Sequence, residues 1–169
     1  MTGSWKHVTL CAASLIAGCG VSKAATDKGL VARYRGCTMA LQQGDWGAWE
    51  HGCLAPGFVR HDPESGDATG AAAREYWQRV KEAFPDVRLQ PQVVLAADHE
   101  VFAILRVTGT HAGVLHCHGD WTASHKPIEV LVLERMRFDD TGHATDDWLY
   151  YDATTVLKQV GALLPETAQ

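Results

Sequence analysis

The sequence predicts a single α+β domain in which helices lead and strands follow. Up to residue 84 the apolar side chains recur at helical steps of three and four, and from residue 87 they alternate at the period of two that is typical of strands. The chain has 169 residues, 46% hydrophobic and 21% charged, which suits one core and gives no reason to expect a second domain. A formal net charge of −5 without a run of Lys or Arg argues against binding to nucleic acid or to an anionic membrane surface.

The beginning of the chain has the composition of an export signal. Lys6 precedes an apolar stretch at 8–17, which is too short to span a bilayer but suits the apolar region of a secretory signal. Small residues then stand directly before Cys19, which resembles the lipobox of bacterial lipoproteins and implies lipidation of Cys19. The alternatives are an ordinary secretory signal cut near residues 24–25 or a buried apolar helix. Both signal interpretations predict an exported protein, and lipidation would anchor it, in the periplasm or at the outer membrane, by an N-terminal lipid.

These signals divide the chain into four parts. They are a lipoprotein-type signal peptide at 1–18, a tether at 19–28, the folded domain at 29–164 and a tail at 165–169. Lipid is the only contact with a membrane that this division predicts.

Three helices are predicted in the first half of the domain. Apolar residues at steps of four, three and four predict the first of them: Leu30, Tyr34, Cys37 and Leu41. Gly44 ends this helix, and Asp45 can cap a second, short helix that carries Trp46 and Trp49. A brief extended piece at 58–61 and a turn-rich loop lead to a third helix at 71–84, which Pro85 stops.

Long strands are predicted at 87–96, 100–110 and 128–138, followed by a fourth at 144–151 and a closing helix at 153–163. Such an order fits a bent antiparallel sheet that wraps over helices. The strand at 128–138 is apolar on both faces, so each face should be covered. Helices can cover one face, and a second copy of the protein can cover the other, which predicts a homodimer.

Three cysteines lie in the folded part of the chain. Cys37 and Cys53 lie on consecutive predicted helices and could form a disulfide, because an exported protein meets an oxidising compartment. Cys117 would then be the free thiol. Three buried, reduced cysteines are the alternative.

Three short motifs occur in order along the domain. They are Phe84-Pro85-Asp86 at the end of a helix, Gly109-Thr110-His111-Ala112-Gly113 at the end of the second long strand, and Trp148 with Asp152 followed by Gln159-Val160-Gly161. Over residues 30–164 they resemble the SnoaL-like polyketide (ester) cyclases of the nuclear transport factor 2-like superfamily. The resemblance implies a cone-shaped, cystatin-like fold, in which a curved antiparallel sheet wraps over the N-terminal helices around an internal cavity.

The resemblance also implies a chemistry. In cyclases of this family a cofactor-free ring closure proceeds by intramolecular aldol addition, with an acid/base carboxylate at the position of Asp152. Isomerases, hydrolases and non-catalytic binders share the superfamily, so the fold alone does not define the function. The sequence departs from the family pattern at 114–121, where a short turn rich in Pro and Thr is usual, and at Asp146, where a Glu is usual. Both departures fall near the expected pocket mouth and bear on the substrate.

The last strand places four side chains on one side of the sheet: Asp146, Trp148, Tyr150 and Asp152. If that side is concave, desolvation raises the pKa of Asp152 and makes it a general base for removing a proton next to a carbonyl. Alternatively, Asp152 caps the closing helix. His111 is predicted as its polar partner, able to donate a proton or to bind a substrate oxygen, and the alternative is a histidine that fixes a strand-end loop.

Substrate contacts are predicted for His61, Trp46, Trp77, Trp148, Asp146 and Tyr150. Of these, His61 is expected at the cavity rim and the tryptophans in the core or the cavity wall. No metal is expected, although His116 and His118, with His125 or His143, form a weak alternative zinc site. The sequence contains neither a phosphate-binding Gly-rich loop nor a Gly-x-Ser-x-Gly elbow, so no cofactor is predicted.

Two functions follow from these features. The first is a cofactor-independent cyclase, isomerase or lyase that acts on a small apolar carbonyl compound. The second is an exported lipoprotein that binds such a compound in the same pocket without changing it.

Overall fold

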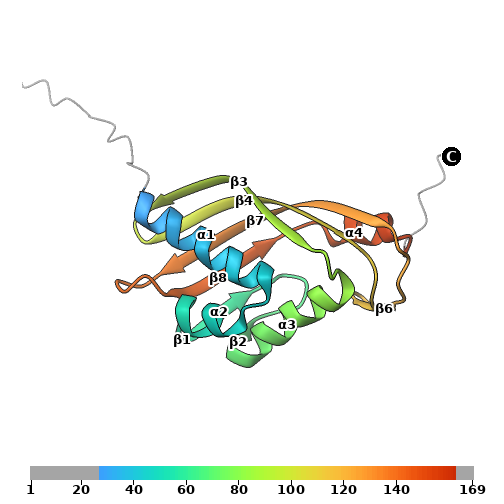
Figure 1. Ribbon diagram of the computed structural model, residues 1–169, viewed down its shortest axis with the longest axis horizontal. Helices are drawn as coiled ribbons and strands as arrows, with labels where there is room; N and C mark the ends of the chain where they lie inside the picture. The colour runs from blue at the N-terminus through green and yellow to red at the C-terminus, as the bar shows by residue number, and fades with distance from the viewer. Residues whose placement is uncertain (1–26, 163–169) are drawn as a thin grey trace, which may run out of the picture.

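The computed structural model describes residues 27–162 and confirms the α+β class. Figure 1 shows three leading helices on one side of a long, curved sheet, with the last helix at its far end. The elements are α1 (Lys28–Gln43), α2 (Trp46–Cys53), β1 (Leu54–His61), β2 (Ala68–Thr69), α3 (Gly70–Ala83), β3 (Arg88–Ala97), β4 (Glu100–Thr110), β5 (Leu115–His116), β6 (Asp120–Trp121), β7 (Pro127–Phe138), β8 (Ala144–Tyr150) and α4 (Ala153–Val160).

Local chemistry defines the helix boundaries close to where the sequence predicts them. Asp27 and Asp45 cap α1 and α2, each accepting a hydrogen bond of 3.0 Å from the backbone nitrogen three residues on. Gly44 ends α1 in the left-handed conformation, at φ +73°, which a side chain would make strained. The chain therefore turns from α1 into α2 through Gly44 and Asp45 alone.

The main sheet has the strand order β2-β1-β8-β7-β4-β3. The long strands β3, β4, β7 and β8 pair antiparallel, as predicted, whereas β1 runs parallel to β8, so the sheet as a whole is mixed. β1 also begins earlier than the extended piece predicted at 58–61, at Leu54. Pro56 and Gly57 lie where the β1–β8 register shifts, so residues that normally break a strand here form an irregularity within it.

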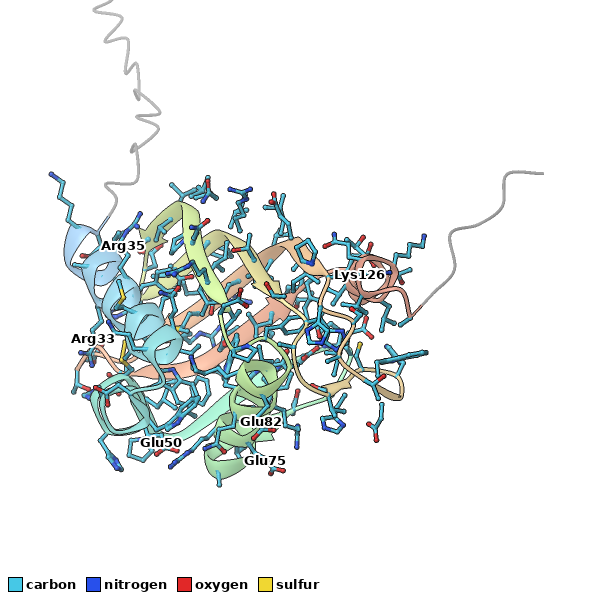
Figure 2. All side chains as sticks on the ribbon, turned by 45° about the vertical axis from the view of Figure 1, so that its right-hand side comes forward. Arg33, Arg35, Glu50, Glu75, Glu82 and Lys126 are labelled. Atoms are coloured by element: carbon cyan, nitrogen blue, oxygen red, sulfur yellow. A yellow bond between two sulfur atoms is a disulfide. The ribbon has the colours of Figure 1, made fainter. Side chains whose placement is uncertain are left out.

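A tight turn at residues 139–142 joins β7 to β8. Asp139 Oδ1 accepts hydrogen bonds of 2.9 Å from the backbone nitrogens of Thr141 and His143. Arg33 on α1, labelled in Figure 2, donates from Nε to the carbonyl of Gly142 at 2.8 Å. The turn is thus fixed both internally and by the first helix.

The two faces of the sheet have different environments. The concave face packs against helices, and β7 contributes its even-numbered side chains to the interior, as Ile128, Val130 and Met136 are buried. On the outer face, large apolar side chains are 43% to 58% exposed: Val93, Leu95, Phe102, Leu131, Leu133 and Tyr150. Helices therefore cover one face of β7, as predicted, and coverage of the other by a second copy stays a prediction.

The motifs that carry the family resemblance join elements of the fold. Asp86, just after α3, accepts hydrogen bonds from the backbone nitrogen and the hydroxyl of Thr110, at 2.7 and 2.8 Å. The backbone nitrogens of Ala112 and Gly113 donate to the carbonyl of Ala83 at 2.9 and 3.2 Å. Gln159 on α4 hydrogen-bonds both the nitrogen and the carbonyl of Glu129, at 2.7 and 2.8 Å. These contacts fasten α3 to β4 and α4 to β7.

Among the glycines in these contacts, Gly113 is the one whose backbone lies too close to its neighbours for a side chain. A Cβ there would lie 2.0 Å from the carbonyl oxygen of Glu82. Gly113→Ala should therefore lower the free energy of unfolding by about 1–3 kcal/mol, measured by urea denaturation. Gly36→Ala is the matched control, because a Cβ on this exposed helical glycine meets nothing within 4 Å and should stabilise α1 by up to about 1 kcal/mol. Equal stability of Gly113→Ala and the parent would contradict the close approach.

A disulfide joins Cys37 of α1 to Cys53 at the end of α2, with 5.7 Å between the Cα atoms. Figure 2 shows the side chains of both helices. The predicted pairing is confirmed, and Cys117 is the free cysteine among the described residues.

Several predictions fall outside residues 27–162. They concern the signal peptide, lipidation of Cys19, most of the tether and the tail, and they remain predictions. Within the described residues, none of the helices combines the length and the apolar character needed to cross a bilayer.

Candidate active site

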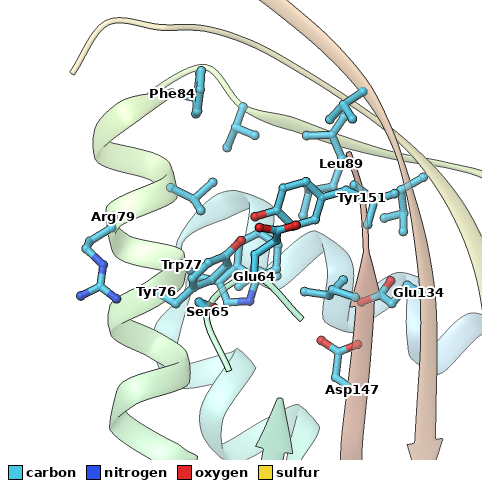
Figure 3. Close-up of a pocket in the computed structure, with 18 of the residues that line it drawn as sticks. Glu64, Ser65, Tyr76, Trp77, Arg79, Phe84, Leu89, Glu134, Asp147 and Tyr151 are labelled. Carbon is cyan, nitrogen blue, oxygen red and sulfur yellow. The ribbon is translucent and has the colours of Figure 1, made fainter. Parts of the chain in front are cut away.

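A cavity of about 550 Å³ lies between the concave face of the sheet and the leading helices. Figure 3 shows it enclosed by α3 on one side and by the long strands on the other. Its walls are mostly apolar and aromatic, with contributions from Leu41, Trp49, Phe58, Trp77, Val80, Phe84, Leu105, Val130 and Leu149. Such a cavity suits an uncharged apolar ligand.

Two carboxyl groups interrupt this apolar lining. Glu134 on β7 and Asp147 on β8 line the cavity, and the two residues are only 9% and 3% exposed. Figure 3 shows them side by side on the strand wall. The hydroxyl of Tyr34, from α1, donates a hydrogen bond to Glu134 Oε2. This donor fixes one carboxyl group, while Asp147 Oδ1 has no partner in the protein.

Burial determines the protonation of this pair. Desolvation raises the pKa of Glu134, against the opposing effect of the Tyr34 hydrogen bond. Desolvation and then the nearby charge of Glu134 raise the pKa of Asp147 well above its ordinary value. The pair therefore retains a proton under conditions in which exposed carboxyl groups have lost theirs. One group can donate a proton while the other accepts one.

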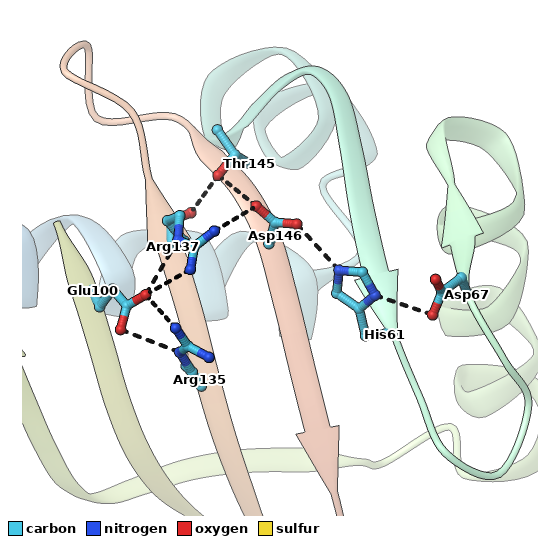
Figure 4. A network of polar contacts seen from close by, with 7 residues as sticks. All are labelled: His61, Asp67, Glu100, Arg135, Arg137, Thr145 and Asp146. Atoms are coloured by element: carbon cyan, nitrogen blue, oxygen red, sulfur yellow. Dashed lines mark hydrogen bonds and ion pairs between the residues drawn. The ribbon is translucent and has the colours of Figure 1, made fainter.

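The structure reverses the predicted orientation of the last strand. Asp147, Leu149 and Tyr151 line the cavity. Asp146 points to the outer face instead (Figure 4), where Trp148 stacks on His61 and Tyr150 is 51% exposed. Alternation was predicted correctly, but the concave side was assigned to the wrong set of residues.

Asp152 is not in the cavity, contrary to the prediction. It is exposed at the N-cap position of α4, where its Oδ2 accepts a hydrogen bond of 2.6 Å from the Thr155 hydroxyl. Hydrogen bonds from Thr155 lower the pKa of Asp152, the reverse of the shift that a buried base needs. Asp152 therefore lies at the start of the closing helix, the position that the alternative interpretation predicted.

His111 is buried but does not line the cavity. Its backbone nitrogen donates a hydrogen bond to the carbonyl of Lys126, and its carbonyl accepts one from the backbone nitrogen of His125. Its Nδ1 lies 3.0 Å from the Ser124 hydroxyl. The ring packs against Phe84, with 5.6 Å between ring centroids. Burial lowers the pKa of His111, so the ring stays neutral. His111 therefore fixes the strand-end loop rather than acting beside Asp152.

His61 and Asp146 belong to a polar network on the outer face (Figure 4), and Trp148 packs against His61. His61 stacks on Trp148 at 4.7 Å between ring centroids, and its two nitrogens lie 3.0 Å from Asp67 and 3.1 Å from Asp146. Partial burial opposes the charged ring, but the two carboxylates outweigh it and raise the pKa of His61. These residues lie together as predicted, but outside the cavity they were expected to line.

Of the three tryptophans predicted near the ligand, only Trp77 lines the cavity. Trp46 packs edge-on against Trp49, with 6.3 Å between ring centroids, and has Arg74 above its ring. Trp49, which the sequence did not single out as a ligand contact, forms the wall in its place.

The departure from the family pattern at 114–121 forms part of the cavity rim. His116, Cys117 and His118 contribute to the lining there. His116 pairs with Asp120 at 2.6 Å and His118 with Glu64 at 2.7 Å, so each histidine has its own carboxylate. Among the described residues, no three His, Cys, Asp or Glu side chains are grouped to hold a metal ion. The alternative zinc site is therefore unsupported.

Comparison with known proteins agrees with this architecture. A family model described as SnoaL-like polyketide cyclase matches residues 31–160. The chain belongs to the SnoaL-like polyketide cyclase family. No curated protein sequence matches it.

Several solved structures share the fold of the chain. AclR from Streptomyces galilaeus, described as a proposed hydroxylase, superposes with a TM-score of 0.69 and 21% identity, over 80% of this chain and 98% of its own. IdmH from Streptomyces antibioticus, described as a proposed polyketide cyclase, gives 0.68 and 23%, over 78% and 98%. TsrD from Streptomyces laurentii gives 0.68 and 19%, over 82% and 100%. The SnoaL-like chain thus has the predicted nuclear transport factor 2-like fold.

The raised pKa values in the SnoaL-like cavity give the fold a pH dependence. Glu134 and Asp147 have higher pKa values in the folded protein than in the unfolded chain. Such a carboxyl group makes its full contribution to stability at a pH below its unfolded-state pKa. This contribution is lost as the pH rises through the folded-state pKa. Asp147→Asn should therefore lose less stability than the parent between about pH 5 and about pH 8.5. Thermal unfolding at both pH values measures this, with Asp152→Asn as the control. A variant as pH-sensitive as the parent would contradict the assignment.

Proposed function

We propose that this protein is a cofactor-independent acid–base enzyme acting on an uncharged carbonyl compound held in the cavity. The observation that carries the proposal is the proton-retaining pair of Glu134 and Asp147 inside an apolar cavity. Supporting it, the family model is described as a polyketide cyclase, and IdmH, a fold relative, is described as a proposed one.

Glu134 is the base of the pair and Asp147 the acid. The hydrogen bond from Tyr34 favours the Glu134 carboxylate, whereas burial and the charge of Glu134 favour a protonated Asp147. An ionised Glu134 would remove a proton from the carbon next to a substrate carbonyl, as Asp147 donates its proton to the carbonyl oxygen. The product of this step is an enol, with Glu134 protonated and Asp147 ionised.

Ring closure can then follow within the cavity. The enol carbon forms a bond to a second carbonyl carbon of the same molecule, and Glu134 gives its proton to the new alkoxide oxygen. The enol hydroxyl gives its proton back to Asp147, so the pair ends as it began. The apolar walls exclude water and hold the two ends of the substrate close together.

The first step can be tested with a simple ketone. We would incubate the purified protein with 2-acetylnaphthalene in D2O and follow exchange of the methyl protons by NMR, while native mass spectrometry measures occupancy of the cavity. Exchange faster than in protein-free buffer is expected. Occupancy with exchange only at the buffer rate would overturn the proposal in favour of binding without chemistry.

A further inference from the structure

Arg60 is a buried charged side chain that the proposed chemistry does not use. It is 1% exposed and lies on the inner side of β1, behind the cavity wall. Its guanidinium carbon lies 3.4 Å from the centroid of the Tyr76 ring, and Nη2 donates a hydrogen bond to Asp62. A cation buried to this extent needs partners for its remaining donors.

Those donors have no partner in the protein. Arg60 Nε and Nη1 are buried and unpaired. Asp62 has little capacity left for them, because its carboxylate also accepts from the Glu64 backbone nitrogen at 2.8 Å and the Ser65 hydroxyl at 2.9 Å. The arginine therefore presents two unused N–H groups inside the protein.

Asp147 carries the complementary unpaired atom. Arg60 and Asp147 are register partners in the parallel pair β1–β8, and both side chains point to the concave side. Asp147 Oδ1 is buried without a donor, yet the guanidinium and the carboxyl group do not form an ion pair in direct contact. Arg60 Nε and Nη1, Asp147 Oδ1 and His111 Nε2 are the buried unpaired side-chain atoms of the described residues, and three of these four belong to the register partners Arg60 and Asp147.

We propose that an ordered water molecule binds between Arg60 and Asp147, and that Arg60 acts through it as a positioning residue for the Glu134–Asp147 pair. Arg60 Nη1 would donate to the water oxygen, and the water would donate one hydrogen to Asp147 Oδ1. A buried water typically makes two to four hydrogen bonds, and polar groups separated by more than a direct contact are commonly bridged in this way. The positioning role rests on the proposed function, whereas the water site does not.

The charges around Asp147 explain why such a water matters. Glu134 on β7 and Asp62 after β1 disfavour its ionised form, while Arg60 favours it. Tyr34, Tyr76 and Tyr151 face the same region from α1, α3 and the end of β8, and they stay protonated because burial raises the pKa of each. A water polarised by Arg60 would deliver a hydrogen bond to the carboxylate and keep Asp147 ionisable despite its burial.

A crystal structure of the ligand-free protein tests the site directly. We expect a water oxygen within hydrogen-bonding distance of Asp147 Oδ1 and of Arg60 Nε or Nη1. Direct contact between the two side chains, or a place filled by other side chains, would overturn the proposal. Because no substrate is involved, the water can be found even if the proposed chemistry fails.

The positioning role has its own test in the free protein. Carboxyl carbon NMR would follow the titration of Asp147 in the parent, in Arg60→Lys and in the outer-face control Arg137→Lys. Because an ammonium cannot present the two N–H groups of Arg60, the Asp147 midpoint should rise by about one pH unit in Arg60→Lys and stay unchanged in the control. An unchanged midpoint in both variants would refute the role. If Arg60→Lys does not fold, the double variant Arg60→Met/Asp62→Asn is compared with Asp62→Asn alone, which keeps the arginine. The Asp147 midpoint should be higher in the double variant, and equal midpoints would refute the role.

Discussion

Replacing Asp147 with Asn is expected to slow α-proton exchange by about 100- to 10,000-fold, the range typical of a lost general acid. The amide keeps the shape of the side chain but has no carboxyl proton to give to the carbonyl oxygen. Native mass spectrometry should show the ketone still bound, because the apolar walls are unchanged. Exchange should therefore fall while occupancy of the cavity is retained.

Asp152→Asn is the matched control for this experiment. Its carboxylate is exposed at the start of α4 and does not line the cavity, so exchange should continue at the parent rate. The reverse result, with Asp152→Asn inactive and Asp147→Asn active, would restore Asp152 as the base and reject the buried pair.

Removing the disulfide is expected to cause the largest loss of stability. Cys37 and Cys53 are separated by 16 residues, and closing a loop of that length contributes about 3 kcal/mol. The double variant Cys37→Ser/Cys53→Ser should lower the free energy of unfolding by that amount in urea denaturation. Because Cys37 lies one helical turn after Tyr34, loosening α1 should also weaken the hydrogen bond to Glu134.

Cys117→Ser serves as the control for the loss of a thiol. This cysteine is unpaired among the described residues and lies at the cavity rim, so its replacement should change stability by less than about 1 kcal/mol. A double variant as stable as Cys117→Ser would show that the disulfide contributes nothing to the folded state.

The sequence predicted the elements well because each has a local cause. Asp45 caps α2, Gly44 ends α1, and Asp98 and His99 make the turn between β3 and β4 with positive φ angles of 51° and 64°. The parallel pairing of β1 with β8 has no such local signal, since it joins segments that are far apart in the chain. Neither the periodicity nor the turn residues could therefore predict it.

The site was harder to predict because alternation does not reveal which face is concave. On β8, Asp146 with Trp148 and Asp147 with Tyr151 offer two similar sets of a carboxylate and an aromatic ring. A usable signal did exist on β7, where Glu134 has the same parity as the buried Val130 and Met136. A lone acid among core residues is a candidate for a perturbed pKa.

The family motifs also drew attention away from the cavity. Asp86, Thr110 and Gln159 join elements of the fold, and His111 supports a loop. Their positions explain why the resemblance predicted the architecture correctly but misplaced the proposed base. A motif that maintains a shared fold need not contain the groups that react.

The turn at 139–142 has a consequence for how this scaffold could change over generations. On strand β8, Asp147 faces the cavity, and Asp146, directly before it, faces the outside. Because side chains alternate, an insertion or deletion of one residue in the turn that slips β8 by one position would exchange their places. The buried acid would then be Asp146, and the reacting centre would move along the wall without any substitution.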